Sequence, residues 1–246
     1  MTARIHTNQS LAPGVSISLP PVAARHVQVL RFQPGDKLTL FNGQGDVEGE
    51  FSVTIQSMGR SDVQVTVGNF VATQREASRA THLAIGMPAN ERMDWLVEKA
   101  TELGVASIQP LMTERSVLRL SGERAEKKRL HWQAIAVAAC EQCGRNRVPL
   151  IHAPAHLSDW FKTGNITDNA RLLLSLQANT QRLAKAANIA ANATRHITIL
   201  SGPEGGLSAT EESAALANGF TPVTLGQRVL RSETAPLACL SYLLLT

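Results

Sequence analysis

The chain has 246 residues, of which 43% are hydrophobic, and a formal net charge of +4 at neutral pH. This length and composition allow one large or two modest domains with real hydrophobic cores. No apolar run reaches the roughly 18 residues that a membrane-spanning helix needs, so we expect a soluble protein. The mildly basic charge permits a polyanionic partner without requiring one.

Residues 1–72 show the patterns of β-structure. Strands are predicted at residues 38–41, 47–55 and 63–67, where apolar and polar residues alternate, and Asn42-Gly43 is a turn signal. A short helix is predicted over residues 21–30. The region therefore predicts a small β-barrel domain. Arg25 and Arg31 either face a phosphate backbone or belong to a solvated surface.

Residues 73–79 are polar and without periodicity, which indicates a linker, and residues 80–246 alternate strands with helices. Strands are predicted at 82–85, 108–112, 171–176, 197–200 and 220–225. Asn90 is predicted to cap a helix that Gly104 ends, and a long helix is predicted over 123–143. Such alternation indicates a parallel sheet with helices on its faces.

Two loops late in the chain carry the main functional signal. Residues 201–207 contain three glycines and a proline, and a capping box of Ser208 and Glu211 follows. The second loop, residues 225–234, contains Arg228, Arg231 and Glu233. Loops at the ends of neighbouring parallel strands bind ligands, although a plain turn is the alternative for the first loop alone. A backbone-lined pocket beside arginines suits a cofactor that brings its own reactivity.

Metal and nucleophile chemistry have little support in the sequence. The chain lacks G-x-S-x-G, H-E-x-x-H and a Walker lysine loop, and its seven histidines show no ligand spacing. Cys140 and Cys143 have C-x-x-C spacing, but no second pair follows, so we interpret them and Cys239 as structural thiols. No metal is predicted. The odd cysteine count and the missing secretory pattern indicate a cytoplasmic protein.

Four motifs in order resemble one known family: Thr113-Glu114-Arg115-Ser116, residues 139–145, residues 202–208 and residues 225–235. They resemble the RsmE family, the ribosomal RNA small-subunit methyltransferases that modify N3 of a uridine in the decoding region of 16S RNA. The resemblance covers the whole chain. It implies an α/β SPOUT-type parallel sheet with a C-terminal trefoil knot and a PUA-like N-terminal domain. It also implies S-adenosylmethionine as cofactor, 16S RNA or the small subunit as partner, and a homodimer.

The resemblance assigns the cofactor-binding residues, position by position, whereas the catalytic and RNA-contacting residues are hypotheses from the chemistry of the side chains. Arg231 is expected to stabilise the uracil anion, with Glu233 or Glu141 as proton acceptor. The expected RNA contacts are Arg25, Arg31, Arg115, Gln142, Arg145 and Arg147. The expected cofactor-binding residues are Leu174, Ser175, Leu176, Gln177, Leu200, Ser201, Gly202, Pro203, Glu204, Gly205, Gly206, Leu225, Gly226, Val229, Leu230 and Arg231.

Two other functions stay open at the level of sequence. One is a SPOUT enzyme that methylates transfer RNA or a ribose hydroxyl. The other is a non-catalytic RNA-binding ribosome-assembly factor, against which the intact glycine loops and Arg231 argue, because a binding module has no need of them.

Overall fold

The computed structural model describes residues 3–45, 47–89, 91–163, 169–193 and 196–245. The chain forms two compact units. The first combines Met1–Glu76 with Val137–Val148, and the second combines Ala77–Ala136 with Pro149–Thr246. Helix α3 (Gly122–Cys143) begins in the second unit, and its residues from Val137 onward belong to the first. The first unit is therefore built from two separate segments of the chain.

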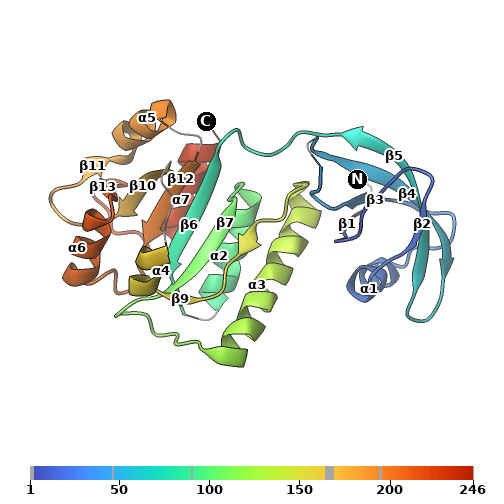
Figure 1. Cartoon of the computed structure of the whole chain (residues 1–246), viewed down its shortest axis with the longest axis horizontal. Coiled ribbons are helices and arrows are strands. Elements are labelled where there is room, and N and C mark those ends of the chain that lie inside the picture. The colour runs from blue at the N-terminus through green and yellow to red at the C-terminus, as the bar shows by residue number, and fades with distance from the viewer. Residues whose placement is uncertain (1–2, 46, 90, 164–168, 194–195, 246) are drawn as a thin grey trace. The chain divides into compact units, whose positions relative to one another are not determined.

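The first unit contains a five-stranded sheet with the order β1-β3-β4-β5-β2 (Figure 1). Its strands are β1 (Arg4–His6), β2 (Ser16–Ser18), β3 (Lys37–Phe41), β4 (Gly49–Met58) and β5 (Val63–Ala72). β1 pairs with β3 in parallel, and the other pairs are antiparallel. The three predicted strands are confirmed as β3, β4 and β5, and the predicted helix is α1 (Pro21–Val29).

Period-two alternation builds the core of this unit. Leu38 and Leu40 of β3, like Val63 and Val65 of β5, are almost completely buried, and the residues between them are more exposed. These side chains cluster with the buried face of α1, which includes Val27. Burial of one face of each strand against one helix is what the alternation predicts.

The second unit contains an eight-stranded sheet with the main order β11-β13-β10-β12-β6-β7-β8, while β9 pairs with β7. Its strands are β6 (Ala80–Gly86), β7 (Ser107–Met112), β8 (Leu150–Ile151), β9 (Ala155–His156), β10 (Asn169–Leu174), β11 (Gln181–Arg182), β12 (His196–Ser201) and β13 (Thr221–Thr224). Every pair described is parallel, so the predicted α/β class is confirmed.

Helices connect these strands. Besides α3 they are α2 (Glu91–Glu102), α4 (Leu157–Thr163), α5 (Leu183–Ala193), α6 (Ala209–Ala217) and α7 (Thr234–Leu244). The predicted cap Asn90 lies outside the described residues, whereas Gly104 ends the α2 segment with a φ of +100°. In the part of the chain that the structure describes, no helix is long and apolar enough to cross a membrane.

The strand order brings the functional loops together. β10 lies between β12 and β13, so the carboxyl ends of the three strands are adjacent (Figure 1). The strand predicted over residues 171–176 ends at Leu174, and Leu176 is 71% exposed in the loop that follows. The apolar run thus contains both a core strand and an exposed loop residue.

Candidate active site

A cavity of about 240 Å³ lies where the loops after β10, β12 and β13 meet. Its lining consists of Arg115, Leu174, Ser175, Leu176, Gln177, Ser201, Gly202, Pro203, Glu204, Gly205, Gly206, Leu207, Glu212, Val223, Thr224, Leu225, Gly226, Arg228, Val229, Leu230, Ser232 and Ala235. All the residues expected to bind the cofactor are among them, except Leu200 and Arg231. Leu200 is instead fully buried in the hydrophobic core.

The loop after β12 is shaped by its glycines. A Cβ on Gly202 would lie 2.7 Å from the carbonyl carbon of Gly206 and from the amide nitrogen of Leu207, so only glycine fits there. Gly206 has a φ of +68° and donates its N–H to the carbonyl of Pro203 at 2.8 Å. The loop therefore folds into a tight turn that leaves backbone groups at the cavity wall.

The predicted capping box is present at the end of this loop. Ser208 accepts a hydrogen bond from the N–H of Glu211, and the Glu211 carboxylate accepts one from the N–H of Ser208 at 2.9 Å. The same carboxylate accepts a hydrogen bond from the N–H of Glu114 at 2.8 Å. The start of α6 is thereby tied to the segment after β7.

Arg115 supports the glycine loop from outside. Its Nη1 donates to the carbonyl oxygen of Gly205 at 2.7 Å and to that of Leu207 at 3.3 Å. A Cβ on Gly205 would lie 3.2 Å from the Cβ of Arg115. Sequence reasoning expected Arg115 to contact RNA; the structure places this exposed side chain in the wall of the cavity, and the RNA contact stays a prediction.

Two glutamates line the cavity with different surroundings. The carboxylate of Glu204 accepts hydrogen bonds from the N–H of Ala89 at 2.9 Å and from Arg92 at 3.2 Å. Glu212 of α6 was not expected at the site. Its two carboxylate oxygens each lie 3.3 Å from the hydroxyl of Ser175, and burial raises its pKa above the usual value.

The two second-unit residues expected to act in catalysis lie just before α7. Arg231 is exposed, and among the described residues no carboxylate forms an ion pair with it. Its carbonyl accepts the N–H of Thr234 and of Ala235 at 3.0 Å, which starts the helix. Glu233 is 8% exposed and accepts a hydrogen bond from Ser232, which lines the cavity.

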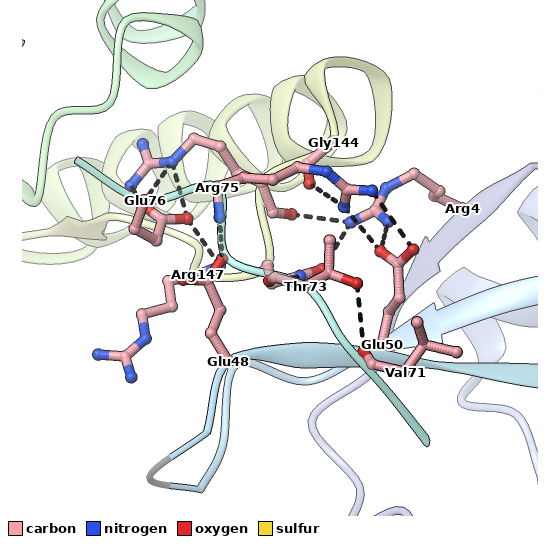
Figure 2. A network of polar contacts seen from close by, with 11 residues as sticks. Arg4, Glu48, Glu50, Val71, Thr73, Arg75, Glu76, Gly144 and Arg147 are labelled. Atoms are coloured by element: carbon pink, nitrogen blue, oxygen red, sulfur yellow. Dashed lines mark hydrogen bonds and ion pairs between the residues drawn. The ribbon is translucent and has the colours of Figure 1, made fainter. Parts of the chain in front are cut away.

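A polar network in the first unit contains Arg145 and its partner Glu76, which Figure 2 labels. The Nε of Arg145 donates to Glu76 at 2.9 Å, and the backbone N–H of Arg147 donates to the same carboxylate at 3.2 Å. The side chain of Arg145 is 7% exposed and that of Glu76 is 17% exposed. The buried guanidinium of Arg145 is engaged by Glu76, which argues against the predicted contact with RNA.

The same network holds the end of α3 against β-structure of the first unit. Arg4 forms an ion pair with Glu50 and donates to the side-chain oxygen of Asn146 at 2.8 Å. Arg75 donates to Glu50 at 2.8 Å and to the carbonyl of Gly144 at 2.9 Å (Figure 2). Burial by itself would raise the pKa of Glu50, but the hydrogen bonds from Arg75 and Arg4 hold it below its usual value.

Glu141, the other expected proton acceptor, belongs to this first unit. Its carboxylate accepts the backbone N–H of His6 at 2.9 Å and lies 3.1 Å from His26 Nδ1. Burial raises the pKa of Glu141, and this effect outweighs the hydrogen bond from the backbone of His6 and the interaction with the side chain of His26, which both lower it. Of the remaining residues expected to contact RNA, all are exposed: Arg25, Arg31, Gln142 and Arg147.

The cysteines and histidines form no metal centre in the described residues, where no group of three or more potential ligands is placed around one point. Cys140, Cys143 and Cys239 are free. Burial raises the pKa of Cys140 and that of Cys239 to about 12. These two thiols are thus protonated at neutral pH, as structural cysteines are.

The comparisons with known proteins agree with this geometry. Residues 75–244 match the family described as RNA methyltransferase domain, and residues 23–68 match the RNA methyltransferase PUA domain. The ribosomal RNA small subunit methyltransferase E of Synechocystis is 31% identical over 93% of this chain and 72% of its own length. That of Buchnera aphidicola is 29% identical over 98% of this chain and 94% of its own length.

Solved structures show the same likeness. A crystal structure of ribosomal RNA small subunit methyltransferase E from Neisseria gonorrhoeae, bound to S-adenosyl methionine, has a TM-score of 0.90 and 33% identity. The alignment covers 98% of this chain and 96% of that one. A putative methyltransferase from Legionella pneumophila, also in complex with S-adenosyl methionine, has a TM-score of 0.90 and 35% identity over 99% and 97% of the two chains.

A parallel sheet with a glycine-lined cavity at its strand ends, joined to a PUA domain, places the protein in the class of RNA methyltransferases. Within that class, the chain belongs to the ribosomal RNA small subunit methyltransferase E family. Sequence similarity to this family extends over both units.

Proposed function

We propose that the protein transfers a methyl group from S-adenosylmethionine to N3 of a uridine in the decoding region of 16S ribosomal RNA. The observation that carries this proposal is the cavity formed by the loops after β10, β12 and β13. The Neisseria relative that is described as bound to this cofactor shares the fold over nearly the whole chain.

The lining of the cavity fits S-adenosylmethionine. The apolar side chains of Val223, Leu225 and Leu230 suit an adenine ring, and exposed backbone groups of the glycine loop suit its polar edges. The cavity also carries charges of both signs, from Arg115 and Glu212, for a zwitterionic amino-acid end. Once bound, the cofactor supplies an electrophilic methyl group on a sulfonium, so the protein mainly has to bind and orient.

Arg231 is proposed to stabilise negative charge on the uracil carbonyls. Its exposed guanidinium follows directly after two residues of the cavity wall, Val229 and Leu230. A single donor of this type contributes about 2.7 to 4 kcal/mol to transition-state stabilisation. Arg231→Ala is accordingly expected to lower kcat by about 100- to 1,000-fold and to leave cofactor binding intact.

Glu233 is the favoured acceptor for the N3 proton. Its hydrogen-bond partner Ser232 lines the cavity, whereas Glu141 already has two partners in the first unit. Methylation rates of Glu233→Gln and Glu141→Gln decide between them. If only the second variant is slow, Glu141 is the acceptor and the preference for Glu233 is wrong.

The RNA surface is proposed to include the exposed side chains of Arg25, Arg31, Gln142 and Arg147. Phosphate contacts by arginines release counterions, so RNA affinity should fall linearly with the logarithm of salt concentration. A titration with a 16S RNA fragment at several salt concentrations measures this slope. A flat response would contradict a phosphate-binding role for these side chains.

We further propose that the protein is a cytoplasmic homodimer whose C-terminal segment is knotted, as the family resemblance implies. Exposed apolar side chains of the cavity lining support a subunit contact there: Val229 is 76% exposed and Leu176 is 71% exposed. Light scattering of the purified protein gives the mass that tests the dimer.

Calorimetric titration with S-adenosylmethionine tests the proposed cofactor. We expect one cofactor per chain and no binding by Gly205→Trp, because a side chain on Gly205 meets Arg115 at the cavity wall. Lys162→Trp is the matched control, since this lysine is 75% exposed on α4. Mass spectrometry of the RNA product then separates N3 methylation of uridine from ribose methylation, and transfer RNA serves as the competing substrate.

A further inference from the structure

The cavity is lined by four charged side chains, Arg115, Glu204, Glu212 and Arg228. Glu212 differs from Glu204 and Arg115 in the partners of its side chain. Glu204 is held by Arg92 and a backbone N–H, and Arg115 is held by two backbone carbonyls. Among the described residues, the side chain of Glu212 has one hydrogen-bond partner, the neutral hydroxyl of Ser175, and no Lys or Arg lies within ion-pair distance of it. Glu212 is therefore a carboxylate at a binding site without a cationic partner.

Ser175 holds this carboxylate in position. The side chain of Ser175 is buried, its backbone N–H donates to Val223 at 3.1 Å, and its hydroxyl oxygen accepts the N–H of Gln177 at 3.1 Å. With that oxygen already accepting, the hydroxyl proton is available for the carboxylate of Glu212, whose oxygens are both at 3.3 Å. The loop after β10 thus aims a donor at Glu212.

The electrostatic setting favours a cationic occupant. Burial raises the pKa of Glu212, and the hydrogen bond from Ser175 and the charge of Arg115 only partly oppose this effect. A cation that enters the cavity stabilises such a carboxylate more than it stabilises a carboxylate that is already paired with a cation of the protein. Since Arg115 lines the same cavity, a ligand that carries an ammonium and a carboxylate matches both signs.

On the basis of the proposed function, we infer that Glu212, oriented by Ser175, binds the α-ammonium group of the methionine part of S-adenosylmethionine. An ammonium has three N–H donors and a full charge, so it forms charge-assisted hydrogen bonds with a carboxylate. A sulfonium has no N–H or O–H donor, and a ribose hydroxyl has no charge. Neither of those groups offers Glu212 both a hydrogen-bond donor and a positive charge.

S-adenosylmethionine and two ligands that lack some of its groups test this inference. S-adenosylhomocysteine keeps the ammonium but has no sulfonium charge, and methylthioadenosine keeps the ribose but has no amino-acid end. Kd values for all three are measured by calorimetry with the unmodified protein and with Glu212→Gln. The matched control is Glu123→Gln, which removes the same charge from a side chain that is 82% exposed on α3.

We expect Glu212→Gln to weaken S-adenosylmethionine and S-adenosylhomocysteine alike, by about 10- to 100-fold, with methylthioadenosine unchanged. Unchanged methylthioadenosine binding also shows that the cavity of the variant is folded. Equal weakening of all three ligands would assign Glu212 to the ribose, and weakening of S-adenosylmethionine alone would assign it to the sulfonium. Either result, or no effect at all, overturns the inference.

Ser175→Ala provides a second variant in case Glu212→Gln does not fold. It leaves the carboxylate in place without its orienting donor, so we expect the same ligand pattern with a smaller loss of affinity. Loss of methylthioadenosine binding in this variant would contradict the orienting role. If the unmodified protein binds none of the ligands, the proposed function fails, which is distinct from a failure of the role of Glu212.

Discussion

Replacing Arg145 by methionine tests whether this arginine is structural or contacts RNA. In the structure its side chain is 7% exposed and its guanidinium donates to the carboxylate of Glu76, which is 17% exposed. Methionine fills a similar volume but leaves the largely buried carboxylate of Glu76 without its counter-charge. Arg145→Met is therefore expected to destabilise the protein rather than only weaken RNA binding.

The expected magnitude follows from this burial. Removing one partner of a buried ion pair costs about 3 to 5 kcal/mol, because the other charge remains uncompensated. Converting Glu76 to glutamine in the same chain removes that charge. The double variant with Arg145→Met and Glu76→Gln is thus expected to recover most of the loss, since neutral replacement of a buried pair is often close to neutral in stability.

Urea denaturation followed by far-ultraviolet circular dichroism measures this free energy. Tryptophan fluorescence complements it, because Trp95, Trp132 and Trp160 all lie in the second unit, whereas Arg145 and Glu76 lie in the first. We expect the midpoint of the transition seen by circular dichroism to shift to lower urea concentration. A loss of about 3 to 5 kcal/mol divided by an m-value of about 1 to 3 kcal/mol/M gives a shift of about 1 to 5 M.

Arg147→Met is the matched control. Arg147 is exposed, and it contacts Glu76 through its backbone N–H, which the substitution keeps. This variant should lose less than about 0.5 kcal/mol of stability and reduce the salt dependence of RNA binding by about one counterion. The reasoning is refuted if Arg145→Met keeps full stability and weakens RNA binding as Arg147→Met does.

Gly202→Ala should abolish cofactor binding, measured by calorimetry, because its Cβ meets backbone atoms at 2.7 Å. Gly206→Ala has open space around its Cβ but a φ of +68°, so it should lower the free energy of unfolding by only about 1 to 2 kcal/mol, measured by thermal denaturation. Ser208→Ala removes a helix cap and should cost about 1 kcal/mol in urea denaturation, and no change would argue against the cap. Burial, followed by the charge of His196, lowers the pKa of His82, so the unfolded chain binds a proton that the folded chain does not. Stability from this difference is fully present above the unfolded pKa of about 6.5 and is lost as the pH falls from that value through the lower pKa of the folded state; His82→Gln should flatten the pH dependence of the melting temperature below about pH 6.5.

The local elements were predictable because their signals lie close together in the sequence. Alternation over residues 38–41 and 63–67 depends on neighbouring residues alone, and the capping box joins Ser208 to a residue three positions away. Most of the residues that the family resemblance implied at the cofactor site line the cavity, and each of their loops directly follows a strand. Strand ends were predicted less well: Leu176 belongs to a loop and not to β10, because apolar character alone does not distinguish a buried strand residue from an exposed loop residue.

The sequence by itself determined the α/β class, the loops that end the strands and, through its motifs, the family. Only the tertiary structure decided which polar side chains meet. Glu76 and Arg145 are 69 positions apart, and Ser175 and Glu212 are 37 apart, yet each pair is in contact. No periodic pattern in the sequence predicts such pairs, because the order of the strands and the packing of the core bring them together. The structure also distinguishes Arg145 from Arg147, because the side chain of Arg145 is buried against Glu76 and that of Arg147 is exposed.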